Sequence, residues 1–315
     1  MMPNEFKRPR LRVGGFTLIE TIITMLITAI LAGMVSVFIS GPVKGYINTA
    51  QRGDLTDEAD LALRRLSREV GLALPNSLRV TTSGGSIYIE FIATSGGGAY
   101  LNELNAISPA NPLNYSNTTV CATTAANCKF DVVGAMPANT AIAAGDYIVV
   151  YNLGQDAAGN SFAPADAYAS GDPCVACNRA KVSPGGVSGN TVTLDANALG
   201  VNVFAAQNPP LPSPSSRFHV VPGSVKAVAF SCPTGTPGNF SRYAGYGFFS
   251  TAAAAITAIG GATPAILASK ATCAVSYTAN ASQRTGLLSV SLTLKDTSGL
   301  ESVTLMREIH LDNSP

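Results

Sequence analysis

The sequence predicts an α+β protein, in which one long, kinked N-terminal helix packs on a β-rich globular domain with long loops. An apolar run from Phe16 to Ile39 precedes a charged segment with helical periodicity, and the remaining chain changes to a period of two. Of the 315 residues, 46% are hydrophobic, which excludes a disordered chain. The formal net charge of +1 offers no basic face for a nucleic acid.

The N-terminus combines a basic segment with an apolar one. Lys7, Arg8, Arg10 and Arg12 oppose the single acid Glu5. As a helix, the following apolar run would be ~36 Å long, enough to cross a hydrocarbon core of ~30 Å. We expect the basic flank to stay cytoplasmic and the body to be exported. A secretory signal cleaved after Ala32 is the alternative, although such signals have shorter apolar runs of ~7–15 residues.

Glu20 is the one charged residue inside the apolar run. A carboxylate within a membrane span costs ~2.5–3.5 kcal/mol or more, so such a residue is a functional candidate by default. Alternatively, Glu20 lies at the level of the lipid headgroups and has little effect.

The junction Gly15-Phe16-Thr17-Leu18-Ile19-Glu20 resembles the leader junction of type IV prepilins and of type II secretion pseudopilins. This resemblance implies that residues 1–15 are a class III leader, which a membrane peptidase removes between Gly15 and Phe16. It also implies N-methylation of Phe16, which becomes the first mature residue. Glu20 would then neutralise the N-terminal amine of a neighbouring subunit during assembly.

The helical segment is expected to have two halves, a transmembrane and assembly helix at 16–40 and an amphipathic half at 41–75. Gly41 and Pro42 predict a kink that interrupts the helix, because proline removes a backbone hydrogen bond and clashes with the preceding turn. Pro75 is expected to end it. One apolar stripe is formed by Leu55, Ala59, Leu63, Leu66 and Val70.

The simplest interpretation of this stripe is that it packs against the protein's own globular domain, with a seam for a partner helix as the alternative. The neighbouring acids suggest either solvated charge or a metal site, and solvated charge is favoured. These acids are Asp54, Asp57, Glu58 and Asp60.

The exported globular domain, residues 76–315, shows a series of strand patterns separated by loops rich in Gly, Pro, Asn and Ser. Strands are predicted at residues 86–92, 146–151, 191–194, 217–221, 225–231, 274–278, 287–295 and 303–311. The last two are expected to form a hairpin. Residues 252–255 fit either a short helix or an insertion loop.

Six cysteines in an exported domain predict disulfides. Six cysteines allow fifteen pairings, and proximity along the chain favours three of them. These are Cys121–Cys128, Cys174–Cys177 and Cys232–Cys273. The Cys174-x-x-Cys177 spacing also admits a redox pair or half of a zinc site, but no βαβ pattern surrounds it and no matching second pair occurs.

The sequence gives only weak signals for catalysis, phosphate binding or calcium binding. His219 and His310 fall within predicted strands, and the chain has no G-x-S-x-G motif for a serine hydrolase. The glycine run from Ser95 to Gly98 lacks the lysine of a phosphate-binding loop and predicts a flexible loop. A turn containing Asp296, Ser298 and Glu301 could bind calcium, although a plain turn is favoured. We therefore expect no cofactor, no metal and no enzymatic activity.

A wider resemblance is to a minor-pilin subfamily of the mannose-sensitive haemagglutinin (MSHA) pilus system. It covers residues 14–80 and 217–315, whereas residues 93–216 are expected to hold insertions. The resemblance implies a single-pass inner-membrane protein with a periplasmic body that later enters an extracellular filament. Its partners would be other pilin subunits, the prepilin peptidase and methyltransferase, and the assembly platform. The alternatives are a type II secretion pseudopilin and a membrane-anchored adhesive domain.

Overall fold

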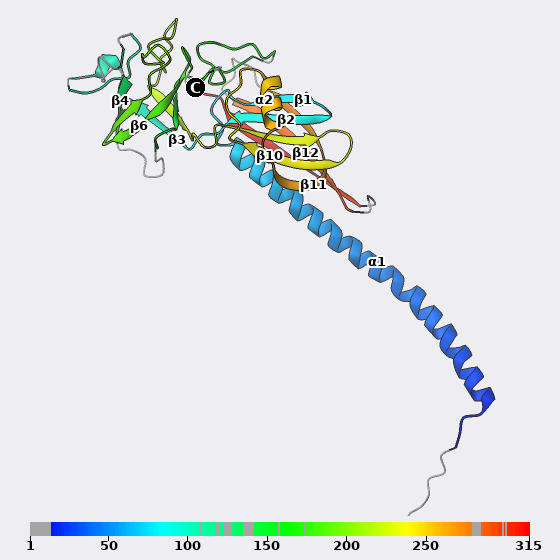
Figure 1. Ribbon diagram of the computed structural model, residues 1–315. Helices are drawn as coiled ribbons and strands as arrows, with labels where there is room; N and C mark the ends of the chain where they lie inside the picture. Colours follow the sequence, from blue (N-terminus) through cyan, green and yellow to red (C-terminus); the bar gives the residue numbers. More distant parts are fainter. Residues whose placement is uncertain are drawn as a thin grey trace, which may run out of the picture. The chain divides into compact units, whose positions relative to one another are not determined.

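The computed structural model describes residues 14–107, 109–116, 120–121, 128–134, 142–156, 158–169, 171–172, 174–278, 285–297, 299 and 301–315. The predicted leader therefore lies outside the described residues, apart from Gly14 and Gly15. Two compact units divide the chain, Met1–Gly53 and Asp54–Pro315. A long helix and a β-rich body are both present, which confirms the α+β class (Figure 1).

Helix α1 spans Leu18–Val70. It continues through Gly41 and Pro42, so the predicted interruption there is wrong. Proline removes one backbone hydrogen bond, but the turns on either side retain theirs, and in a helix of 53 residues this loss is tolerated.

The end of α1 also differs from the sequence prediction, because the helix stops at Val70, before Pro75. The Gly71 and Leu72 amides bond back to carbonyls of the last turn. The Leu74 amide then donates to the Ile92 carbonyl at 2.8 Å. The chain therefore leaves the helix because it joins a strand.

The first part of α1 has no protein neighbours. Every described residue from Gly14 to Ala50 is exposed. An 18-residue window of this helix has a mean hydropathy of 2.6, and within the described chain α1 is the helix that is long and apolar enough to cross a membrane. A helix that is apolar all round needs lipid or other helices as its surroundings.

A seven-stranded antiparallel sheet forms one part of the second unit. Its spatial order is β1-β2-β9-β10-β11-β12-β13. The strands are β1 (Arg79–Ser83), β2 (Ser86–Ile92), β9 (Ala227–Pro233), β10 (Gly238–Ala244), β11 (Ala265–Thr278), β12 (Thr285–Lys295) and β13 (Ser302–Asp312). A short helix, α2 (Ala252–Ile259), connects β10 to β11.

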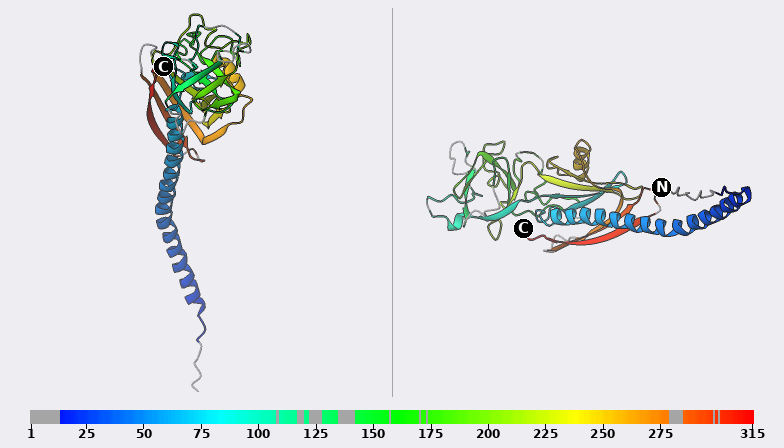
Figure 2. Two further views of the ribbon diagram at one scale, coloured as in Figure 1. Left: turned by 90° about the vertical axis from the view of Figure 1, so that its left-hand side faces the viewer. Right: turned by 90° about the horizontal axis from the view of Figure 1, so that it is seen from below.

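The C-terminal part of α1 packs on this sheet, as Figure 2 shows for the light-blue end of the helix. Ala59, Leu63, Leu66 and Val70 are buried against the sheet, and Leu55 is partly buried there. Full burial of each larger side chain stabilises the fold by ~1.5–3 kcal/mol. The predicted packing of the apolar stripe on the protein's own domain is therefore confirmed, and the partner-helix interpretation of that stripe is wrong.

Polar contacts hold the same helix on the sheet. Glu69 forms an ion pair with Arg242 of β10 at 2.6 Å. Asp60 pairs with Arg307 of β13 at 3.5 Å, and Glu58 accepts a hydrogen bond from the Ser269 amide of β11 at 3.0 Å. Glu58 and Asp60, two of the four clustered acids, thus contact the sheet.

A closed six-stranded barrel forms the other part of the second unit, with the order β3-β4-β7-β6-β5-β8. It is inserted between β2 and β9, which pair directly with each other up to Ile92↔Ala227. The barrel strands are β3 (Gly96–Tyr100), β4 (Lys129–Val133), β5 (Tyr147–Val149), β6 (Arg179–Ser188), β7 (Thr191–Leu194) and β8 (Arg217–Val221). The middle of the chain therefore forms a complete β-barrel, which also includes β8 at Arg217–Val221.

Several strand predictions agree with the structure at both ends, namely those for β2, β7 and β8. Those for β5, β9, β12 and β13 are right to within two residues, and His219 and His310 lie in β8 and β13 as predicted. β11 begins nine residues earlier than expected, at Ala265. Residues 252–255 belong to α2, whose first turn is capped by the Thr251 hydroxyl.

The glycine run is the clearest error of sequence interpretation, because Gly96–Tyr100 is strand β3 and not a flexible loop. β3 closes the barrel by pairing with β8, with Gly97 opposite His219 and Gly98 opposite Phe218. A Cβ atom at Gly97 would lie 2.5 Å from the Phe218 carbonyl oxygen. Glycine is needed here because the two backbones approach too closely for any side chain.

We predict that Gly97→Ala destabilises the chain by about 1–3 kcal/mol, because the added methyl group meets a backbone atom that cannot move without disturbing the barrel. Chemical unfolding of the detergent-solubilised chain, followed by tyrosine fluorescence, measures this. Gly235→Ala is the matched control, since a Cβ there meets nothing within 4 Å. Equal stability of the two variants would contradict this account of barrel closure.

Candidate processing and assembly site

The predicted cleavage junction lies just outside helix α1. Gly14, Gly15, Phe16 and Thr17 precede the first helical residue, Leu18. The Phe16 side chain is 80% exposed, and a Cβ atom built on either glycine meets no atom within 4 Å. Among the described residues, the peptide bond between Gly15 and Phe16 is thus non-helical and unobstructed.

Thr17 caps the N-terminus of the helix. Its hydroxyl oxygen accepts a hydrogen bond from the Glu20 amide at 3.3 Å, and its carbonyl accepts one from the Thr21 amide at 3.2 Å. A threonine followed three residues later by a glutamate is the spacing of a capping box. Sequence reasoning missed this role of Thr17, although the Thr17-x-x-Glu20 spacing indicates it.

Glu20 therefore lies in the first turn of α1, where the positive end of the helix dipole favours a carboxylate. Within the described part of the chain, the carboxylate of Glu20 forms no hydrogen bond and no ion pair. An acidic group in this position is available to a cation supplied from outside the chain.

The hydroxyl groups of the apolar segment are satisfied within the helix. Thr24 donates to the Thr21 carbonyl at 2.9 Å, and Thr28 donates to the Thr24 carbonyl at 2.7 Å. Ser40 does the same to Val37 at 2.9 Å. Such back-bonding removes the cost of placing hydroxyls in lipid. Glu20 is left as the charged group of the segment that needs a partner.

The six cysteines form three disulfides, the same pairs that proximity favoured. The Cα–Cα separations are 5.7 Å for Cys121–Cys128, 6.1 Å for Cys174–Cys177 and 5.8 Å for Cys232–Cys273. Cys232–Cys273 lies in the core of the sheet and connects β9 to β11. These separations fall in the range that disulfides normally show.

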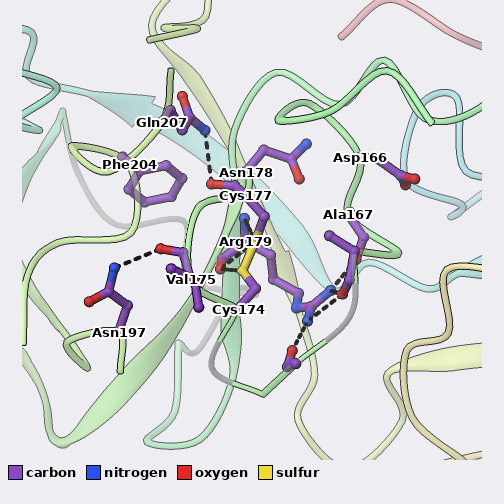
Figure 3. The surroundings of a disulfide bond; sticks show 12 residues. Asp166, Ala167, Cys174, Val175, Cys177, Asn178, Arg179, Asn197, Phe204 and Gln207 are labelled. Carbon is purple, nitrogen blue, oxygen red and sulfur yellow. Dashed lines mark hydrogen bonds between the residues drawn. A yellow bond between two sulfur atoms is a disulfide. The ribbon is translucent and has the colours of Figure 1, made fainter. Parts of the chain in front are cut away.

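Cys174 and Cys177 are buried, although Val175 between them is exposed; Figure 3 shows their disulfide and its surroundings. Asn197 and Gln207 donate side-chain hydrogen bonds to the carbonyls of Val175 and Cys177, at 2.6 Å and 2.9 Å. Because both sulfurs are bonded and largely inaccessible, neither is a thiolate ready for exchange or for zinc. Among the described residues, no group of three or more His, Cys, Asp or Glu is placed to hold a metal.

Arg179 follows this loop and fixes the next one. Its guanidinium donates to the carbonyls of Ala167, Ala169 and Gly171, and Figure 3 shows it beside Ala167. The guanidinium also lies 3.9 Å from the ring centre of Phe248. Burial lowers the pKa of Arg179 to about 10, against the opposing effect of nearby Asp172. The group is therefore charged at neutral pH and serves as a structural cation.

A cleft of about 740 Å³ opens beside β1, residues 153–159 and the start of α2. Arg79 lines it, pairs with the buried Glu90 at 2.7 Å, and stacks on Tyr168 at 3.9 Å. Gln155 connects the network to Asp166 at 3.0 Å. The cleft is thus a mainly uncharged recess at the junction of sheet and barrel, with Arg79 and Asp156 as its charged lining residues.

Two further candidate sites from the sequence are the turn after β12 and His219. In the turn after β12, Asp296 accepts a hydrogen bond from the Glu301 amide at 3.3 Å, while Ser298 lies outside the described residues. Burial lowers the pKa of His219, which favours its neutral form. Neither arrangement assembles a nucleophile with a base.

Comparison with known proteins gives one match. Residues 10–36 match the prokaryotic N-terminal methylation motif, a region that contains Gly15, Phe16 and Glu20. No curated protein and no solved structure matched the chain. Together with helix α1, the match supports a prepilin-type N-terminus, as in the type IV pilin superfamily, on a membrane-anchored, single-pass protein.

We predict that Arg179→Met destabilises the chain by about 3 kcal/mol or more, because buried carbonyls lose their donors. Arg217→Met on β8 is the control, since Arg217 is exposed, and should change the free energy of unfolding by less than ~0.5 kcal/mol. Urea unfolding of the full chain in detergent measures both. A small change in the free energy of unfolding for Arg179→Met would mean that water molecules take over the guanidinium's hydrogen bonds to these carbonyls.

Proposed function

We propose that this chain is a minor type IV pilin of the MSHA type, most similar to the subunit MshO. It would be incorporated into a pilus, or prime its assembly, and so support attachment to surfaces. One observation carries the prepilin part of this proposal, whereas the choice of the MSHA type rests on the resemblance over residues 14–80 and 217–315. Glu20, the single charge of an apolar span that the described residues leave exposed, lies four residues after Phe16 within the matched motif.

The chemistry follows from the charge of the processed terminus. Cleavage after Gly15 would create an α-amine on Phe16, which carries a positive charge at neutral pH. An amine and a carboxylate that are both in apolar surroundings are costly apart and stabilise each other when paired. Glu20 would therefore pair with the amine of a neighbouring subunit and align the helices as they associate. N-methylation of the amine preserves this charge.

The proposal assigns the partners and the location. The prepilin peptidase and methyltransferase would process the junction, and the inner-membrane assembly platform would extract the helix. Other pilin subunits would then surround residues 16–40. The body would face the periplasm first and the exterior once the filament extends, which suits three disulfides. Catalysis would belong to the peptidase, with this chain as its substrate.

A minor pseudopilin of a type II secretion system is the first alternative. It would use the same leader, methylation and helix, so residues 10–36 do not separate the two machines. Neighbouring genes for a pilus or for secretion would separate them. Recovery of the protein in sheared surface filaments would favour the pilus.

An adhesive binding domain on a membrane anchor is the second alternative. The inserted barrel favours it, because the pilin-like sheet forms without the barrel between β2 and β9. The polar cleft beside Arg79 and Gln155 offers a recess for a neutral ligand such as a glycan. Glycan-array binding of the detergent-solubilised chain tests this alternative, and loss of binding in Gln155→Ala would locate the site.

We predict that the mature protein begins at N-methylated Phe16. Mass spectrometry of the N-terminal peptide from membrane-extracted protein measures this. Gly15→Val should accumulate as the uncleaved chain, whereas Gly14→Ala should be processed, although neither glycine makes a tight contact. An intact Met1 or a start after Ala32 would contradict the proposal.

We predict that Glu20→Gln is cleaved and methylated normally but fails to enter filaments, because the amide cannot neutralise a neighbouring amine. The yield of the protein in sheared filaments, relative to the membrane fraction, should fall at least tenfold. Thr28→Val is the control, since its hydroxyl bonds only to backbone carbonyls of its own helix. Normal incorporation of Glu20→Gln would show that Glu20 has no role in assembly.

A further inference from the structure

The seven-stranded sheet ends at β1, and the outer side of this strand is unpaired. β1 pairs with β2, and no other strand of the described residues pairs with it (Figure 1). Gly84 and Gly85 join the two strands, and their positive φ angles of 56° and 76° are typical of a two-residue type I′ turn. In such a hairpin the residues on either side of the turn, Ser83 and Ser86, form a hydrogen-bonded pair.

The register of this hairpin determines which backbone groups of β1 face outward. Hydrogen-bonded pairs alternate with non-hydrogen-bonded pairs along an antiparallel ladder. Ser83, Thr81 and Arg79 therefore bond to β2, whereas the amides and carbonyls of Val80 and Thr82 point away from it. Within the part of the chain that the structure describes, these four outward groups form no hydrogen bond. The edge of β1 thus offers two donors and two acceptors in an extended row.

This edge borders the cleft of about 740 Å³ that residues 76–81 line in succession. On one face of the strand, Leu78 and Val80 belong to the core of the sheet, and Tyr277 of β11 packs on that core and lines the cleft. The side chain of Thr81 points to the other face, where the start of α2 lines the cleft. Because the cleft has walls on both faces of β1, it suits a single extended chain better than the edge of another folded sheet.

The polar side chains of the cleft are already bonded within the chain. Gln155 donates to the Ser250 carbonyl at 2.7 Å, and Arg79 donates to the Phe249 carbonyl at 2.9 Å. The carboxylate of Asp156 accepts hydrogen bonds from backbone amides of its own loop. The groups that remain for a ligand are therefore those of the β1 backbone. Their spacing matches another backbone in the extended conformation.

We propose that the cleft binds an extended polypeptide segment of another protein, which adds to the free edge of β1 as a further strand of the sheet. The main-chain hydrogen bonds of Val80 and Thr82 would hold the segment, as in other cases of strand addition. Five extended residues span ~17 Å, the length of β1. The segment would be a chain end or a linker, because a strand inside a folded sheet has neighbours of its own.

The two faces of β1 also specify the side chains of the bound segment. The residue opposite Val80 would point to the same face as Val80, toward Leu78 and Tyr277, and should be apolar. The next residue, opposite Thr81, would point to the face of α2 and can be polar. The expected ligand is thus a segment of about five residues in which apolar and polar side chains alternate.

Peptide binding to the detergent-solubilised full chain tests the proposal. The probes are fluorescent heptapeptides with lysine at both ends, threonine at alternate positions, and valine, leucine, isoleucine, phenylalanine or tyrosine between them. We expect at least one of them to bind, as measured by fluorescence anisotropy, and at least tenfold more tightly than the same peptide with N-methylated backbone amides. Equal binding of the methylated peptide, or no binding by any probe, would overturn the proposal.

A proline variant tests the edge itself. Val80→Pro removes an outward amide and leaves the ladder between β1 and β2 intact, a position at which edge strands tolerate proline. Val80→Ala is the matched control, because it also shortens the side chain but keeps the amide. We expect Val80→Pro to bind the best peptide at least tenfold more weakly than Val80→Ala, with urea unfolding confirming that both fold. Equal affinities would overturn strand addition at β1.

Hydrogen exchange of the unmodified chain decides the case if Val80→Pro does not fold. The best peptide should slow exchange of the Val80 and Thr82 amides at least tenfold, while the Thr81 amide, already bonded to β2, should change little. Bound peptide that leaves the Val80 and Thr82 amides unprotected would overturn the proposal. Protection that appears without peptide and rises with protein concentration would identify a second copy as the occupant and overturn the choice of a foreign segment.

The inference stands apart from the proposed function, because β1 lies outside residues 10–36 and the contact requires no processing. Failure of strand addition would therefore leave the pilin proposal standing. A glycan that binds the cleft when every peptide fails would overturn this inference and support the adhesive alternative. Peptide binding by a chain that is never cleaved before Phe16 would support strand addition and contradict the pilin proposal.

Discussion

The constraint on which the rest of this molecule depends is that the first part of α1 is apolar on every side and the chain buries none of it. Only lipid or other helices can surround such a segment, so it accounts for the membrane anchor, and under the proposed function it is also the surface that neighbouring subunits contact. The same constraint explains why the threonine hydroxyls bond to the helix's own carbonyls and why a lone carboxylate, Glu20, has to find a partner. From Asp54 onward the helix instead buries one face on the sheet.

The sequence was informative wherever a feature is local. The apolar run, the stripe from Leu55 to Val70, the C-terminal hairpin and the N-terminal methylation motif all follow from periodicity or short motifs, and all were predictable. The barrel was not, because its closure pairs β3 with β8, more than a hundred residues later, through glycines that resemble a loop. The helix end was missed for a similar reason, since Leu74 bonds to Ile92 of a strand. Thr17 differs from these two features, because the Thr17-x-x-Glu20 spacing alone predicts its capping role.

The position of the barrel keeps it structurally separate from the sheet on which α1 packs. Because the ends of β2 and β9 are adjacent in the sheet, a domain inserted between them leaves the strand pairing intact. A small cluster that includes Leu74, Ile92, Tyr147 and Val221 joins the barrel to the sheet, and the Arg79 network reinforces the junction. The surface of the barrel can therefore vary without disturbing the packing of α1. This division suits a subunit whose helix serves assembly and whose insertion serves recognition.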